Sequence, residues 1–291
     1  MLTFKELLAL NIITEEIHKD LQSILDEPET DRGDRPAVYA HQKKLNTFVK
    51  TFKSLAEKGE DTGLEGGTPK KGSSRAVFFP KDPKKIHIDG KEVNQHTAVK
   101  IAFPGALDKH TGSHMLLGEH QNEIESDNYT RKAHSMLVEG HDGHYTTNED
   151  GVTAPVLGDH PDHHWLEMAK ADNMTAGKFK SMTKTDTHPK GLDFKHFVGT
   201  LQHDHAEAHG QIHFSGVSPE DREKTREHPL FQNTQDFIYS TDNHPADLRL
   251  QNYGVWKHPV TGKEHPVIRD YGFSNQIAGL YAKANRKKFG W

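Results

Sequence analysis

Closely spaced strand patterns between residues 76 and 103 constrain the fold of this chain most strongly. Residues 97–103 (TAVKIAF) alternate in the two-residue period of a β-strand, with Lys100 on the side opposite Val99 and Ile101. Before them, two short strand-like segments flank Asp89-Gly90, a pair that supplies the positive φ of a tight turn. This part of the chain therefore predicts an antiparallel arrangement of short strands.

Helical periodicity dominates elsewhere in the chain. We expect helices over residues 2–25, 45–55, 113–138, 194–201, 230–238 and 274–291. Further strands are expected over residues 152–157, 165–169, 252–256 and 266–268, and a Gly- and Lys-rich linker over 58–75. Strands that cluster first and helices that cluster later are typical of the α+β class.

Composition narrows the functional classes. The net charge of −5 argues against a general nucleic-acid-binding surface, so nucleic acid is not an expected partner. The absence of cysteine excludes disulfide and thiolate chemistry. The chain has no apolar run that could span a bilayer and no signal-peptide pattern at its start, so we expect a cytoplasmic protein without a membrane partner.

Three short motifs follow one another in an order that suits phosphoryl transfer. They are Ala98-Val99-Lys100 on a predicted strand, the stretch from His244 to Asn252 (HPADLRLQN), and Asp270-Tyr271-Gly272 after a predicted hairpin. Transfer from ATP needs a cation for the phosphates, a carboxylate that fixes this cation, ligands for a metal, and a carboxylate that orients the attacking hydroxyl. The three motifs contain residue types for each of these parts.

Together the motifs resemble the protein-kinase-like superfamily. They are similar, in order, to its V-A-I-K strand, its H-R-D-L-x-x-x-N catalytic loop and its D-F-G motif. Asn252 lies five residues after Asp247, which is the spacing in that family. The His lies three residues before Asp247 instead of two, and no A-P-E motif follows Asp270. The resemblance is therefore closest to short, atypical bacterial or phage-type kinase-like proteins.

The resemblance implies a catalytic set and a metal-binding set. Asp247 would orient the acceptor hydroxyl, Lys100 would hold the α- and β-phosphates, and Arg249 would lie near the γ-phosphate. Asn252 and Asp270 would hold Mg²⁺ or Mn²⁺. ATP would be the cofactor, and the acceptor would be a hydroxyl of unknown origin, on a protein or a small molecule.

The resemblance also implies further contacts to the nucleotide. A glutamate of the predicted helix 113–138 would pair with Lys100; Glu119 and Glu123 share one face, and Glu123 is favoured because it lies mid-helix. The glycine-rich loop would be replaced by the stretch from Lys71 to Arg75, which includes Gly72, Ser73 and Ser74 and could offer backbone N–H groups and cations to phosphates. Met168, in the strand 165–169, would lie beside the adenine.

The implied architecture is a two-lobed kinase-like fold of the α+β class. It divides into an N-terminal helical extension (1–58), a mainly β N-lobe (59–170) and a reduced helical C-lobe (171–291). Two alternatives stay open. One is a pseudokinase, a nucleotide-binding or scaffold module without catalysis.

The other alternative is a zinc-binding protein, since the chain contains 23 His. The cluster 203–209 (HDHAEAH) would place His205 and His209 four residues apart on a helix, with Asp204 and Glu207 as additional ligands. Because His is frequent throughout the chain and no H-E-x-x-H motif is present, we expect solvated polar groups here and an unchanged stability on chelation.

Overall fold

The structure is a computed structural model of the chain. It describes residues 50, 52–59, 61–72, 75–102, 117–127, 133–161, 163, 165–211, 215–241, 243–272, 274, 275 and 278. These residues form a mixed α+β fold, which confirms the predicted class. The predicted helix 2–25, most of 45–55 and nearly all of 274–291 lie outside the described residues.

The five-stranded sheet carries the strand on which Lys100 lies. Its order is β1 (Lys70–Lys71), β2 (Arg75–Phe78), β5 (Thr97–Ala102), β9 (Trp165–Ala169) and β8 (Val156–Asp159), with antiparallel pairing throughout. All six residues of β5 are buried because the strand is central and both of its faces are covered.

Two smaller sheets complete the β-structure of the described residues. The predicted hairpin around Asp89-Gly90 is present as β3 (Lys84–Ile88) and β4 (Lys91–Gln95), in a sheet of order β4-β3-β7-β6. Its other strands are β7 (Tyr145–Thr147) and β6 (Leu137–Glu139). The third sheet joins β10 (Asp172–Asn173), β11 (Tyr253–Lys257) and β12 (Glu264–Ile268). The last two form the hairpin predicted before Asp270.

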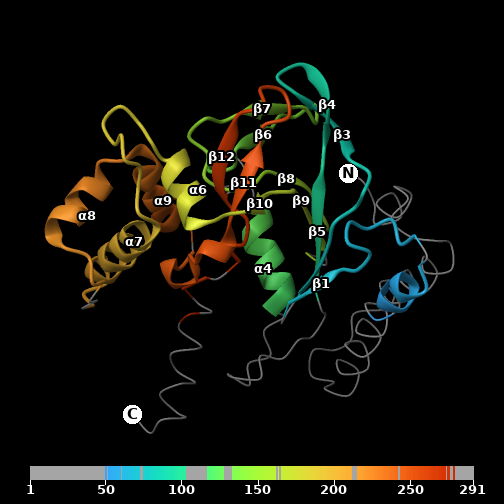
Figure 1. Cartoon of the computed structure of the whole chain (residues 1–291), viewed down its shortest axis with the longest axis horizontal. Coiled ribbons are helices and arrows are strands. Elements are labelled where there is room, and N and C mark those ends of the chain that lie inside the picture. The colour runs from blue at the N-terminus through green and yellow to red at the C-terminus, as the bar shows by residue number, and fades with distance from the viewer. Residues whose placement is uncertain are drawn as a thin grey trace, which may run out of the picture.

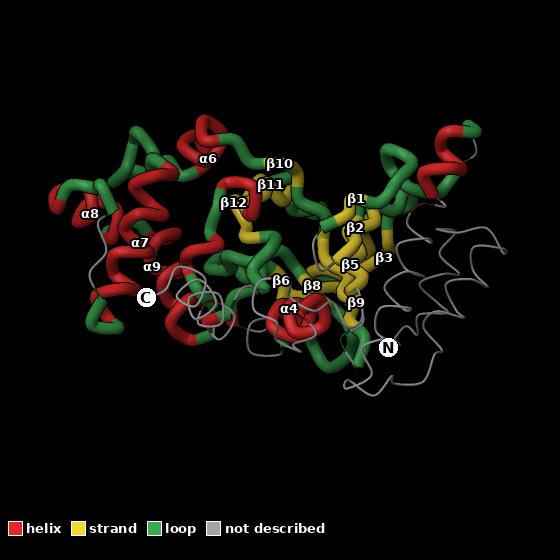
Figure 2. Tube along the Cα trace, turned by 90° about the horizontal axis from the view of Figure 1, so that it is seen from below, coloured by secondary structure: helices red, strands yellow, loops and turns green. Residues whose placement is uncertain are grey.

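The helices separate into one that packs on the sheet and a group at the opposite end. Helix α4 (Leu117–Ser126) contacts β5, β8 and β9. Figures 1 and 2 show helices α6 to α9 together, with β10–β12 between them and the five-stranded sheet, whereas the helical turn at residues 52–57 lies on the other side of that sheet. The group comprises α6 (Ala176–Met182), α7 (Phe194–Ala208), α8 (Pro219–Arg226) and α9 (Pro229–Ser240). Among the described residues, no helix combines the length and the apolar character needed to cross a membrane.

One predicted helix is shorter than the sequence indicates. The periodicity predicts a helix over 113–138, but α4 ends at Ser126 and residues 137–139 form strand β6. Leu137 pairs with Thr147 and is buried, so the apolar residues at this end belong to a sheet. A short apolar run fits either period, and tertiary pairing decides between them.

The hydrophobic core runs from the strands into the helical group. The predicted stripe on 194–201 is buried at Phe194, Phe197 and Leu201, and α9 buries Phe231 and Phe237. The ring of Phe197 meets that of Phe231 edge-on at a centroid distance of 5.8 Å. Helix α7 contacts a short 3₁₀ turn, η1 (Pro245–Asp247), and a second such turn, η2 (Leu250–Asn252), follows it in the chain.

Candidate functional site

Lys100 forms a buried ion pair with Glu125. Its Nζ atom lies 2.6 Å from Glu125 Oε2, and it also donates a hydrogen bond of 2.7 Å to the backbone carbonyl of Arg269. The side chain of Lys100 is 7% exposed and that of Glu125 is fully buried. Desolvation by burial lowers the pKa of Lys100, although the Glu125 carboxylate opposes this effect. The strand lysine therefore faces the interior of the site.

The glutamate that pairs with Lys100 is Glu125, and the expectation of Glu123 is wrong. Glu123 is exposed and lies 3.1 Å from His120 on the same helix. The side chain of Glu119 is outside the described residues. Residues two apart on a helix point in directions that differ by about 200°. Glu123 therefore points away when Glu125 faces β5.

Glu125 also fastens helix α4 to the segment after β12. Its Oε1 atom accepts hydrogen bonds of 3.1 Å from the backbone N–H groups of both Tyr271 and Gly272. The Tyr271 hydroxyl donates to the backbone carbonyl of Glu125 at 3.0 Å. A side chain at position 272 would collide with the helix, because an added Cβ would lie 2.6 Å from the Cβ of Gln121. The glycine in this motif is thus required by close packing.

Asp270 is the second carboxylate, after Glu125, that lies close to both Arg75 and Lys100. Its Oδ1 atom lies 2.6 Å from Arg75 Nη2 and 3.9 Å from Lys100 Nζ. Burial by itself would raise its pKa, but Lys100 and Arg75 more than offset this effect and lower the pKa to about 2. The carboxylate is therefore ionised at neutral pH, and its side chain remains 46% exposed.

Arg75 belongs to the segment expected to replace the glycine-rich loop, but its ion pairs with Glu125 and Asp270 were not predicted from the sequence. It begins strand β2 and is 6% exposed. Its guanidinium donates to Glu125 Oε1 at 3.0 Å, to Asp270 Oδ1 at 2.6 Å and to Asn122 Oδ1 at 3.2 Å. Val77 pairs with Lys100, and Arg75, two residues earlier on β2, lies on the same face of the sheet. The two-residue alternation of strand β2 indicates that Arg75 and Val77 share a face. It predicts that this face carries Lys100 only when the pairing of β2 with β5 is known.

Asp247 and Asn252 are joined as their spacing suggests. The Asn252 amide nitrogen donates to the backbone carbonyl of Asp247 at 2.7 Å and to its Oδ2 atom at 3.0 Å. Desolvation by burial, with the negative charge of Asp270 added, raises the pKa of Asp247 to about 6. The two carboxylates thus interact electrostatically, and Asp247 can exchange a proton close to neutral pH.

The remaining residues of the HPADLRLQN stretch shape this turn. His244 caps η1 by accepting the Ala246 N–H at its Nδ1 atom, 3.1 Å away. Arg249 is exposed, and its Nε atom lies 3.8 Å from Asp247 Oδ1. The guanidinium of Arg269 donates to the carbonyl oxygens of Gln251 and Ala171. Arg269 thus ties the turn that carries Asn252 to the segment before β10.

The predicted nucleotide contacts on the sheet have different surroundings. Gly72 is exposed and its N–H donates to the Arg75 carbonyl at 2.8 Å, which closes the tight turn between β1 and β2. Ser73 and Ser74 lie outside the described residues. Met168 is 1% exposed and pairs with Ala98, so it lies on the same sheet face as Lys100 but within the core. Contact between Met168 and a nucleotide stays a prediction.

The donors around Asp270 fit a hard divalent cation. Asp270 supplies an ionised, partly exposed carboxylate. Asn252 uses its amide nitrogen for both contacts with Asp247, so its amide oxygen is the atom of this side chain that could ligate a metal. Carboxylate and amide oxygens are the ligands that Mg²⁺ and Mn²⁺ prefer.

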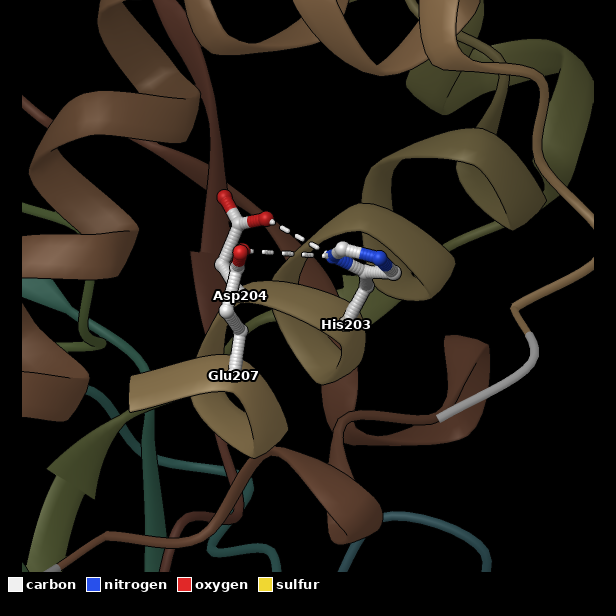
Figure 3. Close-up of side chains that lie close together, drawn as sticks. All are labelled: His203, Asp204 and Glu207. Carbon is white, nitrogen blue, oxygen red and sulfur yellow. Dashed lines mark hydrogen bonds and ion pairs between the residues drawn. The ribbon is translucent and has the colours of Figure 1, made fainter. Parts of the chain in front are cut away.

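The His-rich cluster of α7 forms an ion-pair network. His203, Asp204 and Glu207 bring three potential metal-ligating atoms within 4.8 Å of one another, as Figure 3 shows. Asp204, however, is already engaged by the Arg226 guanidinium, which donates to its two oxygens at 2.7 and 3.0 Å. A cation on Asp204 would have to displace this bidentate pair.

The two predicted zinc ligands of α7 pack against each other. The rings of His205 and His209 lie 4.3 Å apart, and His209 Nδ1 donates to the His205 carbonyl at 2.7 Å. Desolvation by burial, together with the neighbouring His244 and His209, lowers the pKa of His205 to about 4. These contacts agree with packed and capped histidines.

Comparisons with known proteins do not assign this chain to a family. No protein-family model matches the chain, and no curated protein matches it significantly.

Proposed function

We propose that this chain is an ATP-dependent phosphotransferase with a two-lobed, protein-kinase-like organisation. One observation carries the proposal. The buried Lys100–Glu125 pair lies beside Asp270, and Asp270 in turn interacts electrostatically with Asp247. Four residues distant in sequence thus provide a phosphate-binding cation, the carboxylate that fixes it, a metal-binding carboxylate and a proton acceptor.

The proposed lobes follow the distribution of these groups. Lys100 and Glu125 belong to the strand-rich part within 59–170, whereas Asp247, Asn252 and Asp270 belong to 171–291. The sheet face that carries Lys100 also carries Ala98 and Leu166, which are both buried next to the lysine. ATP with Mg²⁺ or Mn²⁺ is the proposed cofactor, with its phosphates between the two parts.

Each residue then has one chemical task. Lys100 holds the α- and β-phosphates, and Asn252 and Asp270 hold the cation, which neutralises charge on the phosphates. Asp247 accepts the proton of the acceptor hydroxyl while the oxygen of that hydroxyl forms a bond to the γ-phosphorus. The bond from that phosphorus to the bridging oxygen breaks, and ADP leaves with the electron pair. A pKa of about 6 leaves Asp247 mostly ionised at pH 7 and able to accept this proton.

The test measures binding and transfer separately. ATP with Mg²⁺ or Mn²⁺ should raise the melting temperature of the purified chain, because a ligand that binds only the folded state stabilises it. γ-Labelled ATP should then label an added lysate or the chain itself. Lys100→Met should lose both signals, whereas Lys85→Met, an exposed lysine of β3 paired with Glu92, should keep them. Absence of any shift at millimolar nucleotide would refute nucleotide binding, and binding without transfer would favour the pseudokinase.

A further inference from the structure

Asp270 forms a shorter ion pair with Arg75 than with Lys100. The Arg75 Nη2 atom is 2.6 Å from Asp270 Oδ1, whereas Lys100 Nζ is 3.9 Å away and lies closer to Glu125. The carboxylate proposed to bind metal is therefore in direct contact with an arginine as well as close to Lys100. The resemblance places Arg75 in the segment expected near the phosphates, but it does not predict an ion pair between Arg75 and Asp270.

A divalent cation on Asp270 would meet this guanidinium at close range. Its charge would repel Arg75, and both would compete for the same carboxylate oxygens. With two cations, Arg75 and Lys100, facing two anions, Glu125 and Asp270, the cluster is balanced without metal. Metal binding without a further anion would thus add two uncompensated positive charges.

The other contacts of Arg75 allow its guanidinium to exchange partners without leaving the site. Nη1 is held by Asn122, and Nη2 is shared between Glu125 and Asp270. The backbone of Arg75 closes the tight turn at Gly72, where the resemblance predicts the phosphate-binding loop. A phosphate oxygen could replace Asp270 on Nη2 while the contacts to Asn122 and Glu125 persist. Guanidinium groups form charge-assisted hydrogen bonds with both phosphate and carboxylate oxygens.

We propose that Arg75 is an internal counter-ion that makes metal binding depend on the nucleotide. It holds Asp270 until phosphates arrive, then transfers to a phosphate oxygen and releases Asp270 to the metal. The proposal rests on the proposed function, since it requires ATP phosphates at this site. Because coupling between two ligands is reciprocal, metal should increase nucleotide affinity by the same factor as nucleotide increases metal affinity.

The test begins with metal alone, so that it does not depend on turnover. Mn²⁺ binding is measured by calorimetry or electron paramagnetic resonance for the wild type, Arg75→Gln and Arg75→Lys. Arg75→Gln removes the charge and should bind Mn²⁺ at least about tenfold more tightly, a modest share of a charge–charge interaction at this distance. Arg75→Lys keeps the charge and should stay close to wild type. The gain should disappear in Arg75→Gln/Asp270→Asn, which assigns it to Asp270.

The second measurement is metal-free nucleotide binding. Arg75→Gln should bind ATP in the presence of chelator at least about tenfold more weakly, because a phosphate contact is lost. Arg226→Gln, which breaks an ion pair with Asp204 instead, is the matched control and should change neither affinity. Circular dichroism melting of each variant verifies that it is folded.

The outcomes separate the two proposals. If Arg75→Gln binds Mn²⁺ no more tightly than wild type, Arg75 is not a counter-ion of the metal site and the inference is overturned. If Arg75→Gln does not fold, the inference is tested with Arg75→Lys. Tighter Mn²⁺ binding by Arg75→Lys than by the wild type would also overturn the inference. If Mn²⁺ affinity responds as expected but no variant binds ATP, the proposed function fails while the competition for Asp270 stands.

Discussion

Gly272 lies directly against Gln121 of helix α4, so closely that a Cβ on the glycine would be 2.6 Å from the Gln121 Cβ atom and 2.9 Å from its backbone. The segment that carries Asp270 is therefore fitted to the helix that carries Glu125. This contact gives the first prediction.

Gly272→Ala should destabilise the fold by about 1–3 kcal/mol, the usual cost of an added methyl group in a packed interface. Gly177→Ala is the matched control, since nothing lies within 4 Å of a Cβ there and the residue is in helix α6. Alanine should stabilise that helix by about 0.5–1 kcal/mol. Urea unfolding of both variants checks the pair, and equal effects would contradict the packing of α4 on Gly272.

Glu125→Gln should reduce the free energy of unfolding by about 3–5 kcal/mol. The change leaves the buried cations Arg75 and Lys100 with one acidic partner fewer. Glu123→Gln on the same helix should have an effect within about 0.5 kcal/mol because Glu123 is exposed. Denaturant unfolding measures both. If Glu123→Gln reduced the free energy of unfolding as much as Glu125→Gln does, this would favour Glu123 as the partner of Lys100.

Asp247→Asn should increase stability at pH 7 while it removes activity. The folded-state pKa of about 6 lies above the ordinary 3.8, so the folded state binds more protons than the unfolded state between these values. The carboxyl group therefore lowers stability as the pH rises through this window. Its amide replacement should gain about 1–3 kcal/mol at pH 7 and little at pH 4.

The same variant tests the proposed proton acceptor. Turnover by the wild type should fall as the pH drops through about 6. Asp247→Asn should lose at least about a hundredfold in turnover with nucleotide affinity nearly intact. Wild-type turnover by this variant would show that the H-R-D-L-x-x-x-N match is coincidental.

Chelation should leave the melting temperature of the chain unchanged, because Arg226 already satisfies Asp204 in the His-rich cluster. Arg226→Gln should lower stability by about 1–3 kcal/mol, since it leaves the buried Asp204 carboxylate without its main partner. A large drop on chelation that zinc reverses would instead reveal a metal coupled to folding.

Much of the site could be predicted where local spacing determines geometry. The alternation in 97–103 places Lys100 on one face of a strand, and the five-residue offset brings Asn252 to Asp247. The hairpin of β11 and β12 follows from its turn residues and delivers Asp270 to its end. These features depend on contacts close in sequence.

Features set by packing between distant segments could not be predicted. Helical spacing shows that Glu119 and Glu123 share a face, but the rotation of α4 about its axis depends on the sheet and selects Glu125. Arg75 reaches the site through the register of β2 against β5, which the sequence does not encode locally. Residues 137–139 fit a helix in isolation and become a strand because β7 pairs with them.

The shared carboxylate of Glu125 has a mechanical consequence. One oxygen receives Arg75 and the amides of Tyr271 and Gly272, while the other receives Lys100. The helix cannot swing outward, nor the segment after β12 rearrange, without breaking the same set of bonds. Helix position and segment conformation are therefore coupled, so that any displacement of α4 should be accompanied by a rearrangement of the segment after β12.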